Sequence, residues 1–137
     1  MGRILAIDYG TKRTGIAVTD PLRIVPGALD TVPTHTLVDF LTEYFKKEPV
    51  DTIVIGYAKN MDNTDAASMK QIHPFVNRIK KLFPDKELVM QDERFTSVLA
   101  HRTILDSGIG RMARRDKPLV DRISATIILQ SYMDTLK

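Results

Sequence analysis

The feature that most constrains the fold is a short apolar run at residues 4–7 (Ile-Leu-Ala-Ile) that stops at Asp8. A turn with two glycines and two cations follows, and the apolar pattern resumes at residues 16–18. This predicts a β-hairpin with arms at 4–9 and 15–19. A carboxylate at the end of a buried strand costs several kcal/mol unless something pairs with it. Asp8 therefore either bonds the turn and its cations or serves as a metal ligand or phosphate-facing group, and we favour the second.

The composition excludes several other classes of site. The chain has 137 residues, enough for one domain over residues 1–137, and it contains no cysteine. It can therefore form no disulfide framework, thiolate zinc site or cysteine nucleophile. No signal-peptide core or membrane-length apolar run is present, so we expect a cytoplasmic protein without membrane contact. The histidines share no metal-ligand spacing and are expected at the surface or as helix caps: His35, His73 and His101.

The hydrophobic periods beyond the hairpin predict an α/β fold. The expected elements are, in order, a third extended segment at 24–32, a helix from 36 to 48, a buried parallel strand at 52–56, a helix at 69–83, a strand at 87–91, and helices at 96–106 and 118–136. Three meandering strands followed by alternating helices and strands describe one mixed five-stranded sheet, antiparallel over its first three strands and then parallel, flanked by helices.

Three local signals refine these elements. Pro26-Gly27 predicts a bulge in the third strand. Thr36 with Asp39 three residues later is typical of a capping box at the start of a helix. Pro74, inside the next helix, predicts a kink or a break.

Further acids follow the last strand and open the last helix. Asp92 and Glu93 end the strand, where open α/β sheets place their sites, and Asp121 follows Pro118 in the first turn of the final helix. Each alone is explained as well by a salt bridge or by the helix dipole. If they gather with Asp8, three carboxylates repel unless a divalent cation neutralises them, and oxygen ligands of this kind suit Mg²⁺ or Mn²⁺. Two such ions about 4 Å apart can activate water at a phosphodiester.

Basic residues lie near these acids along the chain. Lys12 and Arg13 occupy the hairpin turn beside Asp8, and Arg94 follows Glu93, which it could orient as well as it could contact a nucleic-acid backbone. Gly108 and Gly110 precede a basic loop formed by Arg111, Arg114, Arg115 and Lys117. Such a run is either a solvated face or a phosphate-binding loop.

Four segments together carry a specific resemblance. They are residues 8–15 (Asp-Tyr-Gly-Thr-Lys-Arg-Thr-Gly), Gly56 with residues 60–62 (Asn-Met-Asp), residues 92–97 (Asp-Glu-Arg-Phe-Thr-Ser), and Asp121 with residues 125–130. In this order they resemble the YqgF/RuvX family over nearly the whole chain. These are small bacterial proteins similar to Holliday-junction resolvases, with a ribonuclease-H-like fold, and they are described as nucleases of pre-16S rRNA.

The resemblance implies a metal-dependent endonuclease with Asp8, Glu93 and Asp121 as its acidic triad. Asp92 is a possible substitute for Glu93, and Asp62 is a weaker one. The implied substrate is structured RNA, most specifically the 5′ end of pre-16S rRNA in ribosome biogenesis, with branched DNA as the alternative. A nucleic-acid-binding module without chemistry remains an alternative of another class, and a monomer and a homodimer both remain open. An actin-type or sugar-kinase-type ATPase would need two such lobes.

Overall fold

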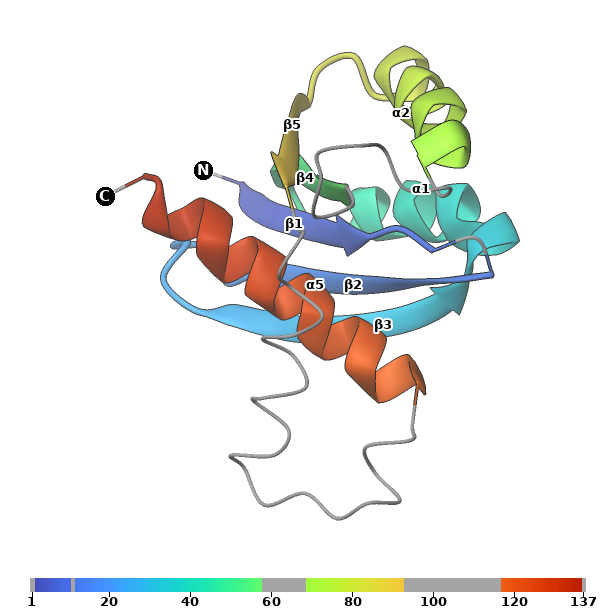
Figure 1. Cartoon of the computed structure of the whole chain (residues 1–137). Helices are drawn as coiled ribbons and strands as arrows, with labels where there is room; N and C mark the ends of the chain where they lie inside the picture. Colours follow the sequence, from blue (N-terminus) through green and yellow to red (C-terminus); the bar gives the residue numbers. More distant parts are fainter. Residues whose placement is uncertain (1, 11, 58–68, 93–116, 137) are drawn as a thin grey trace.

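The computed structural model describes residues 2–10, 12–57, 69–92 and 117–136 (Figure 1). Its elements are β1 (Arg3–Asp8), β2 (Arg13–Thr19), β3 (Pro26–Pro33), the 3₁₀ turn η1 (Thr34–Thr36), α1 (Leu37–Lys47), β4 (Val50–Tyr57), α2 (Met69–Leu82), β5 (Glu87–Asp92) and α5 (Lys117–Asp134). Helices α1 and α2 cover one face of the sheet and α5 crosses the other (Figure 1). The expected helix at 96–106 lies outside the described residues.

The sheet has five strands in the order β3-β2-β1-β4-β5. β1 pairs antiparallel with β2, and β2 antiparallel with β3. β4 is parallel to both β1 and β5. The predicted mixed sheet is confirmed, and the order is that of a ribonuclease-H-like fold. β1, the strand that ends at Asp8, is the central strand.

The side chains of β1 alternate between two cores, one on each face of the sheet. Leu5 and Ile7 belong to a buried cluster with residues of α1 and α2, and Ile4 and Ala6 belong to a second cluster with residues of α5. The α5 side of that second cluster consists of Ala125, Ile128, Leu129 and Met133. Because apolar side chains of β1 are buried on both faces, the strand is held in place from both sides.

The bulge in the third strand lies elsewhere than predicted. Ile16 of β2 pairs with Asp30, whereas the next residue, Ala17, pairs with Ala28, so Leu29 is the extra residue. Pro26 instead pairs with Thr19 at the first position of β3, where a proline is tolerated. The prediction at Pro26-Gly27 is wrong because it considered composition without the partner strand.

The helix signals also need correction. The Thr36 hydroxyl caps no helix amide; its Oγ1 donates to the carbonyl oxygen of Pro33 at 2.8 Å, as hydroxyls in short turns often do. The 3₁₀ turn takes the place of the predicted capping box. Helix α2 continues through Pro74, so the predicted break does not occur, and the alternative, a kink, stays a prediction. Within the part of the chain described here, no helix is long and apolar enough to cross a membrane.

Candidate functional site

Asp8 lies half-buried at the carboxyl end of the central strand, between two glycines. Its in-register neighbours are Gly15 on β2 and Gly56 on β4. In-register residues of neighbouring strands point to the same face of a sheet. The positions beside the Asp8 carboxylate therefore carry no side chain on either flanking strand, which leaves room for a ligand.

The alternation of β1 directs Asp8 to the face that α5 covers. Ala6, two residues earlier, packs against α5, and its partner Val54 belongs to the same cluster. Asp8 has the same parity as Ala6 and so shares this face. Figure 1 shows α5 running back across the sheet, with its first residues toward the end of the sheet where β1 ends. The carboxyl end of β1 and the start of α5 thus lie at the same end of the molecule.

The turn after Asp8 is fixed by one hydroxyl. Thr34 Oγ1 donates to the carbonyl oxygen of Gly10 at 2.6 Å, and the Thr34 amide donates to the carbonyl of Lys12 at 2.9 Å. Thr34 Oγ1 also lies 3.0 Å from Oγ1 of the fully buried Thr14. Since Thr34 has only one hydroxyl proton, Thr14 is the donor in this pair. Residue 34 thereby ties the turn to the end of β3.

This role of Thr34 was not predicted from the sequence. The available signal was the Thr-His-Thr run after Pro33, which places two hydroxyls at a strand–helix junction. Gly10 is required at its position for a related reason, because a Cβ there would collide with the carbonyl oxygen of Arg13. Gly10 and Lys12, the described residues of the turn, are therefore both held by Thr34.

The remaining predicted acids are placed only in part. Asp92 is the last residue of β5 and Asp121 lies in the second turn of α5, whereas Glu93 and Asp62 lie outside the described residues. No group of three or more metal-binding side chains occurs among the residues that the structure describes. Of the three predicted acids, only Asp8 has a side chain that the structure describes. Grouping of the three acids thus stays a prediction.

The Asp8 environment fits a hard divalent cation. A carboxylate supplies the oxygen ligand that Mg²⁺ and Mn²⁺ prefer. The half-buried position limits hydration, and the two flanking glycines provide space on the face of α5. A cation of this size could bind there without displacing a side chain of either flanking strand.

The predicted cations fall into two sets. Lys12 is exposed in the hairpin turn and Arg13 is half-buried at the first position of β2. Lys117 is the first residue of α5. The others lie outside the described residues: Arg94, Arg111, Arg114 and Arg115. His35 and His73 are exposed, as predicted, and His101 lies outside the described residues.

A pocket of about 370 Å³ opens on the α1–α2 face of the sheet, and one of its lining residues directly follows Asp8 in the sequence. Tyr9 lines it, and the Tyr9 ring lies 5.0 Å from the ring of Phe75 on α2. Burial raises the pKa of the Tyr9 phenol above its ordinary value, so the hydroxyl stays protonated at neutral pH. This pocket was not predicted, because it joins residues of three distant segments.

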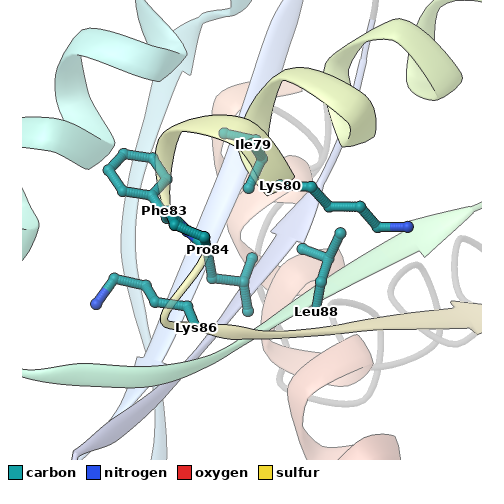
Figure 2. Close-up of a pocket in the computed structure, with 7 residues that line it drawn as sticks. Ile79, Lys80, Phe83, Pro84, Lys86 and Leu88 are labelled. Carbon is teal, nitrogen blue, oxygen red and sulfur yellow. The ribbon is translucent and has the colours of Figure 1, made fainter.

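A smaller hollow of about 180 Å³ lies between the end of α2 and the beginning of β5, lined by Ile79, Lys80 and Leu88 among others (Figure 2). The ammonium groups of Lys80 and Lys86 point away from it in opposite directions (Figure 2). Lys86 Nζ donates to the carbonyl of Val50 at 2.7 Å and lies 4.6 Å from the ring centre of Phe45. This hollow is a packing feature of the opposite end of the sheet, away from Asp8.

Comparison with known proteins gives a consistent result. A model of the RuvX family, described as "Holliday junction resolvase", matches residues 2–135. Three curated relatives share the name "Putative pre-16S rRNA nuclease". That of Porphyromonas gingivalis is 59% identical over 98% of this chain and 97% of its own length. That of Phocaeicola vulgatus is 56% identical over 100% of this chain and 99% of its own length. That of Flavobacterium johnsoniae is 50% identical over 98% of this chain and 98% of its own length.

Proposed function

The chain belongs to the RuvX family, and on that premise we propose that it is a metal-dependent endonuclease that cleaves structured RNA at the 5′ end of pre-16S rRNA. The names of the relatives support the choice of substrate, and the position of Asp8 supports a metal-dependent reaction. The single observation that carries the proposal is the position of Asp8 between two glycines, at the end of the central strand and on the face of α5. A nucleic-acid substrate follows from membership of a nuclease family.

The spacing along α5 supports Asp121 as the second acid. Residues 121, 125 and 128 recur at intervals of four and three, which places them on one face of an α-helix. Ala125 and Ile128 are buried against the same face of the sheet as Ala6. The same spacing would put position 121 on the helix face that packs against the sheet, in the first half of α5.

The alternation of β5 supports Glu93 over Asp92 as the third. Leu88 packs with the α1–α2 core, whereas Val89 packs with α5. Gln91 Nε2 donates to Ser131 Oγ of α5 at 3.0 Å. Odd-numbered positions of β5 thus share the face of Asp8, and the next odd position in the sequence is 93. We propose Asp8, Glu93 and Asp121 as the ligand set, with Mg²⁺ or Mn²⁺ as the cofactor.

The residues of the turn would position the substrate. When bound, the divalent cation would supply charge neutralisation at the phosphodiester and activation of water. The Asp8 carboxylate would hold the cation at the end of a strand packed on both faces, so little reorganisation would be needed. Lys12 and Arg13, in a turn fixed by Thr34, would bind the phosphates on either side of the cleaved bond. The basic residues between 108 and 117 would hold the more distant backbone.

Two further properties belong to the proposal. Residues 1–137 would form one domain, since both cores share one sheet and the family match covers 2–135. The protein would act in the cytoplasm, where precursor rRNA is made.

The test is a cleavage assay with a 5′ precursor fragment of 16S rRNA and a four-way DNA junction, each with Mg²⁺, with Mn²⁺ and with a chelator. We expect metal-dependent cleavage of the RNA at defined positions, and its loss in Asp8→Asn. Equal cleavage by Asp8→Asn would refute the site. Cleavage of the junction alone would favour the second candidate, a Holliday-junction resolvase, which the description of the family supports.

A further inference from the structure

The pocket beside Tyr9 lies at the same end of the sheet as Asp8 but on its opposite face. Asp8 and Tyr9 are consecutive, and side chains of consecutive residues in an extended chain point to opposite faces. Asp8 points toward α5, whereas Tyr9 packs against the α1–α2 core. The pocket and the Asp8 carboxylate therefore lie on opposite faces of the sheet, at the carboxyl end of β1.

The wall of the pocket is aromatic. The Tyr9 and Phe75 rings lie 5.0 Å apart at 33° to each other, and the exposed Pro74 continues this wall on α2. Val38 of α1 adds an aliphatic surface opposite them. A volume of about 370 Å³ falls at the lower end of the range for small-molecule pockets, which suits one nucleotide rather than a peptide.

The rim of the pocket is basic. Arg78 on α2 and His35 in η1 both line it and both are exposed. A guanidinium at the mouth of an aromatic pocket matches a phosphate joined to a base, since aromatic rings stack on bases and arginine binds phosphate in a forked geometry. An apolar ligand would not use the Arg78 charge. An isolated phosphate would not use the aromatic wall of Tyr9 and Phe75.

We propose that this pocket binds one unpaired nucleotide of the substrate, adjacent to the nucleotide whose phosphate reaches Asp8. The nucleic-acid strand would pass across the carboxyl end of β1 at residues 8–9. The cleaved phosphate would then lie on the α5 face and the neighbouring base against Tyr9. Arg78 would contact the phosphate of that neighbour. The enzyme would then require an unpaired nucleotide next to the cleavage position, which sets its preference for loops, flanks and branch points over continuous duplex.

The inference rests on the proposed function, so its test measures binding without cleavage. A labelled RNA hairpin with a single-stranded flank is titrated in chelator over a series of salt concentrations. Arg78→Gln is compared with Lys47→Gln, an exposed helical cation at the other end of the sheet. We expect Arg78→Gln to reduce the slope of log affinity against log salt by about 0.7, one single-strand phosphate contact. Lys47→Gln should match the wild type.

A second readout detects the base itself. Single abasic nucleotides are placed in turn along the flank, and one position should weaken binding by about 5-fold or more, the loss expected for one stacked base. That penalty should persist in Tyr9→Phe and disappear in Tyr9→Leu. Thermal melts establish that both variants are folded; if Tyr9→Leu is not, the Arg78→Gln slope decides alone.

The outcomes separate the two proposals. A wild-type slope in Arg78→Gln, or an abasic penalty unchanged in folded Tyr9→Leu, overturns the nucleotide pocket and leaves the nuclease proposal standing. Absence of binding to both RNA and branched DNA by the wild type contradicts the proposed function itself.

Discussion

Asp8 on β1 is the in-register partner of Gly56 on the parallel strand β4. The carboxylate therefore lies beside a position without a side chain, at the end of the strand that both cores hold. The strand is packed on both faces, and both in-register neighbours of its last residue are glycines. This combination favours a ligand site at Asp8 over a purely structural acid.

Asp8→Asn should reduce metal-dependent cleavage by about 100-fold or more, because the cation loses a charged ligand. Stability without metal should stay level or rise, since the change also removes carboxylate repulsion. Thermal melts with and without Mg²⁺ measure the change in stability. Asp85→Asn, at an exposed acid, is the matched control. A much lower melting temperature for metal-free Asp8→Asn would mean that Asp8 is structural.

Asp92, the last residue of β5, and Glu93, which follows it in the sequence, should differ in their effect on activity. Glu93→Gln should lower the cleavage rate by orders of magnitude, whereas Asp92→Asn should cost much less, because consecutive residues of an extended chain face opposite sides. Single-turnover cleavage of the RNA fragment by both variants measures the difference. The reverse ranking would assign the ligand role to Asp92.

The hydroxyl pair that fixes the turn should be energetically coupled. Thr34→Val should lower the free energy of unfolding by about 1–3 kcal/mol, because it leaves the buried Thr14 hydroxyl without its acceptor. Thr34→Ser should restore most of this loss. Adding Thr14→Val to Thr34→Val should cost less than the sum of the two changes, since neither hydroxyl is then left unsatisfied. Urea unfolding of the wild type, the three single variants and the double variant tests this, and strict additivity would contradict the pairing.

Asp51 should make stability depend on acid pH. Its carboxylate accepts hydrogen bonds from the Gly2 amide at 2.7 Å and from Arg23 at 3.0 Å, and these partners hold its pKa below the ordinary value. Because the pKa is lowered on folding, the contribution to stability is full above about pH 4 and is lost as pH falls through the folded value. Asp51→Asn should therefore melt below the wild type at pH 7, and the gap should narrow toward pH 3. A gap independent of pH would exclude this role.

The basic loop should contribute to affinity without reading sequence. Replacing Arg111, Arg114 and Arg115 by Ala should reduce the salt slope by about 0.9 per lost contact on duplex and about 0.7 on single strands. The loss should be similar for different sequences of the same shape. The control replaces three exposed lysines at the other end of the sheet: Lys47, Lys80 and Lys81. If the slope of the arginine variant does not change, the loop is only a solvated connection and Lys12 and Arg13 must hold the substrate.

Patterns of local origin were predictable from the sequence. The continuous apolar run at residues 52–56 predicted a buried parallel strand, and β4 pairs on both sides with parallel strands. The hydrophobic period over residues 36–48 predicted the helix that is α1, and Leu37 and Leu41 on its inner face are fully buried. Asp8 at the end of a strand was equally visible, because the change from apolar to charged residues occurs at a single position.

Features that depend on distant partners were not predictable. The bulge at Leu29 is defined by register with β2, and Thr36 bonds a carbonyl rather than capping the helix because of the 3₁₀ turn before it. Thr34 acquires its role only when the end of β3 meets the hairpin turn, 24 residues away in sequence. The pocket at Tyr9 likewise requires α1, α2 and β1 to be packed together.

From the strand order we expect β1 and β5 to differ in how readily they open. Asp8 ends the central strand, whose amides should exchange hydrogen only on global unfolding, whereas β5 is an edge strand of the described sheet and can open locally. A ligand that joins Asp8 to residues at the end of β5 would thus order the edge strand and change β1 little. Hydrogen exchange with and without Mg²⁺ should show slowed exchange at residues 90–92 and unchanged exchange at residues 4–7. The active site would then be completed by its cofactor, with one half preformed and the other assembled on binding.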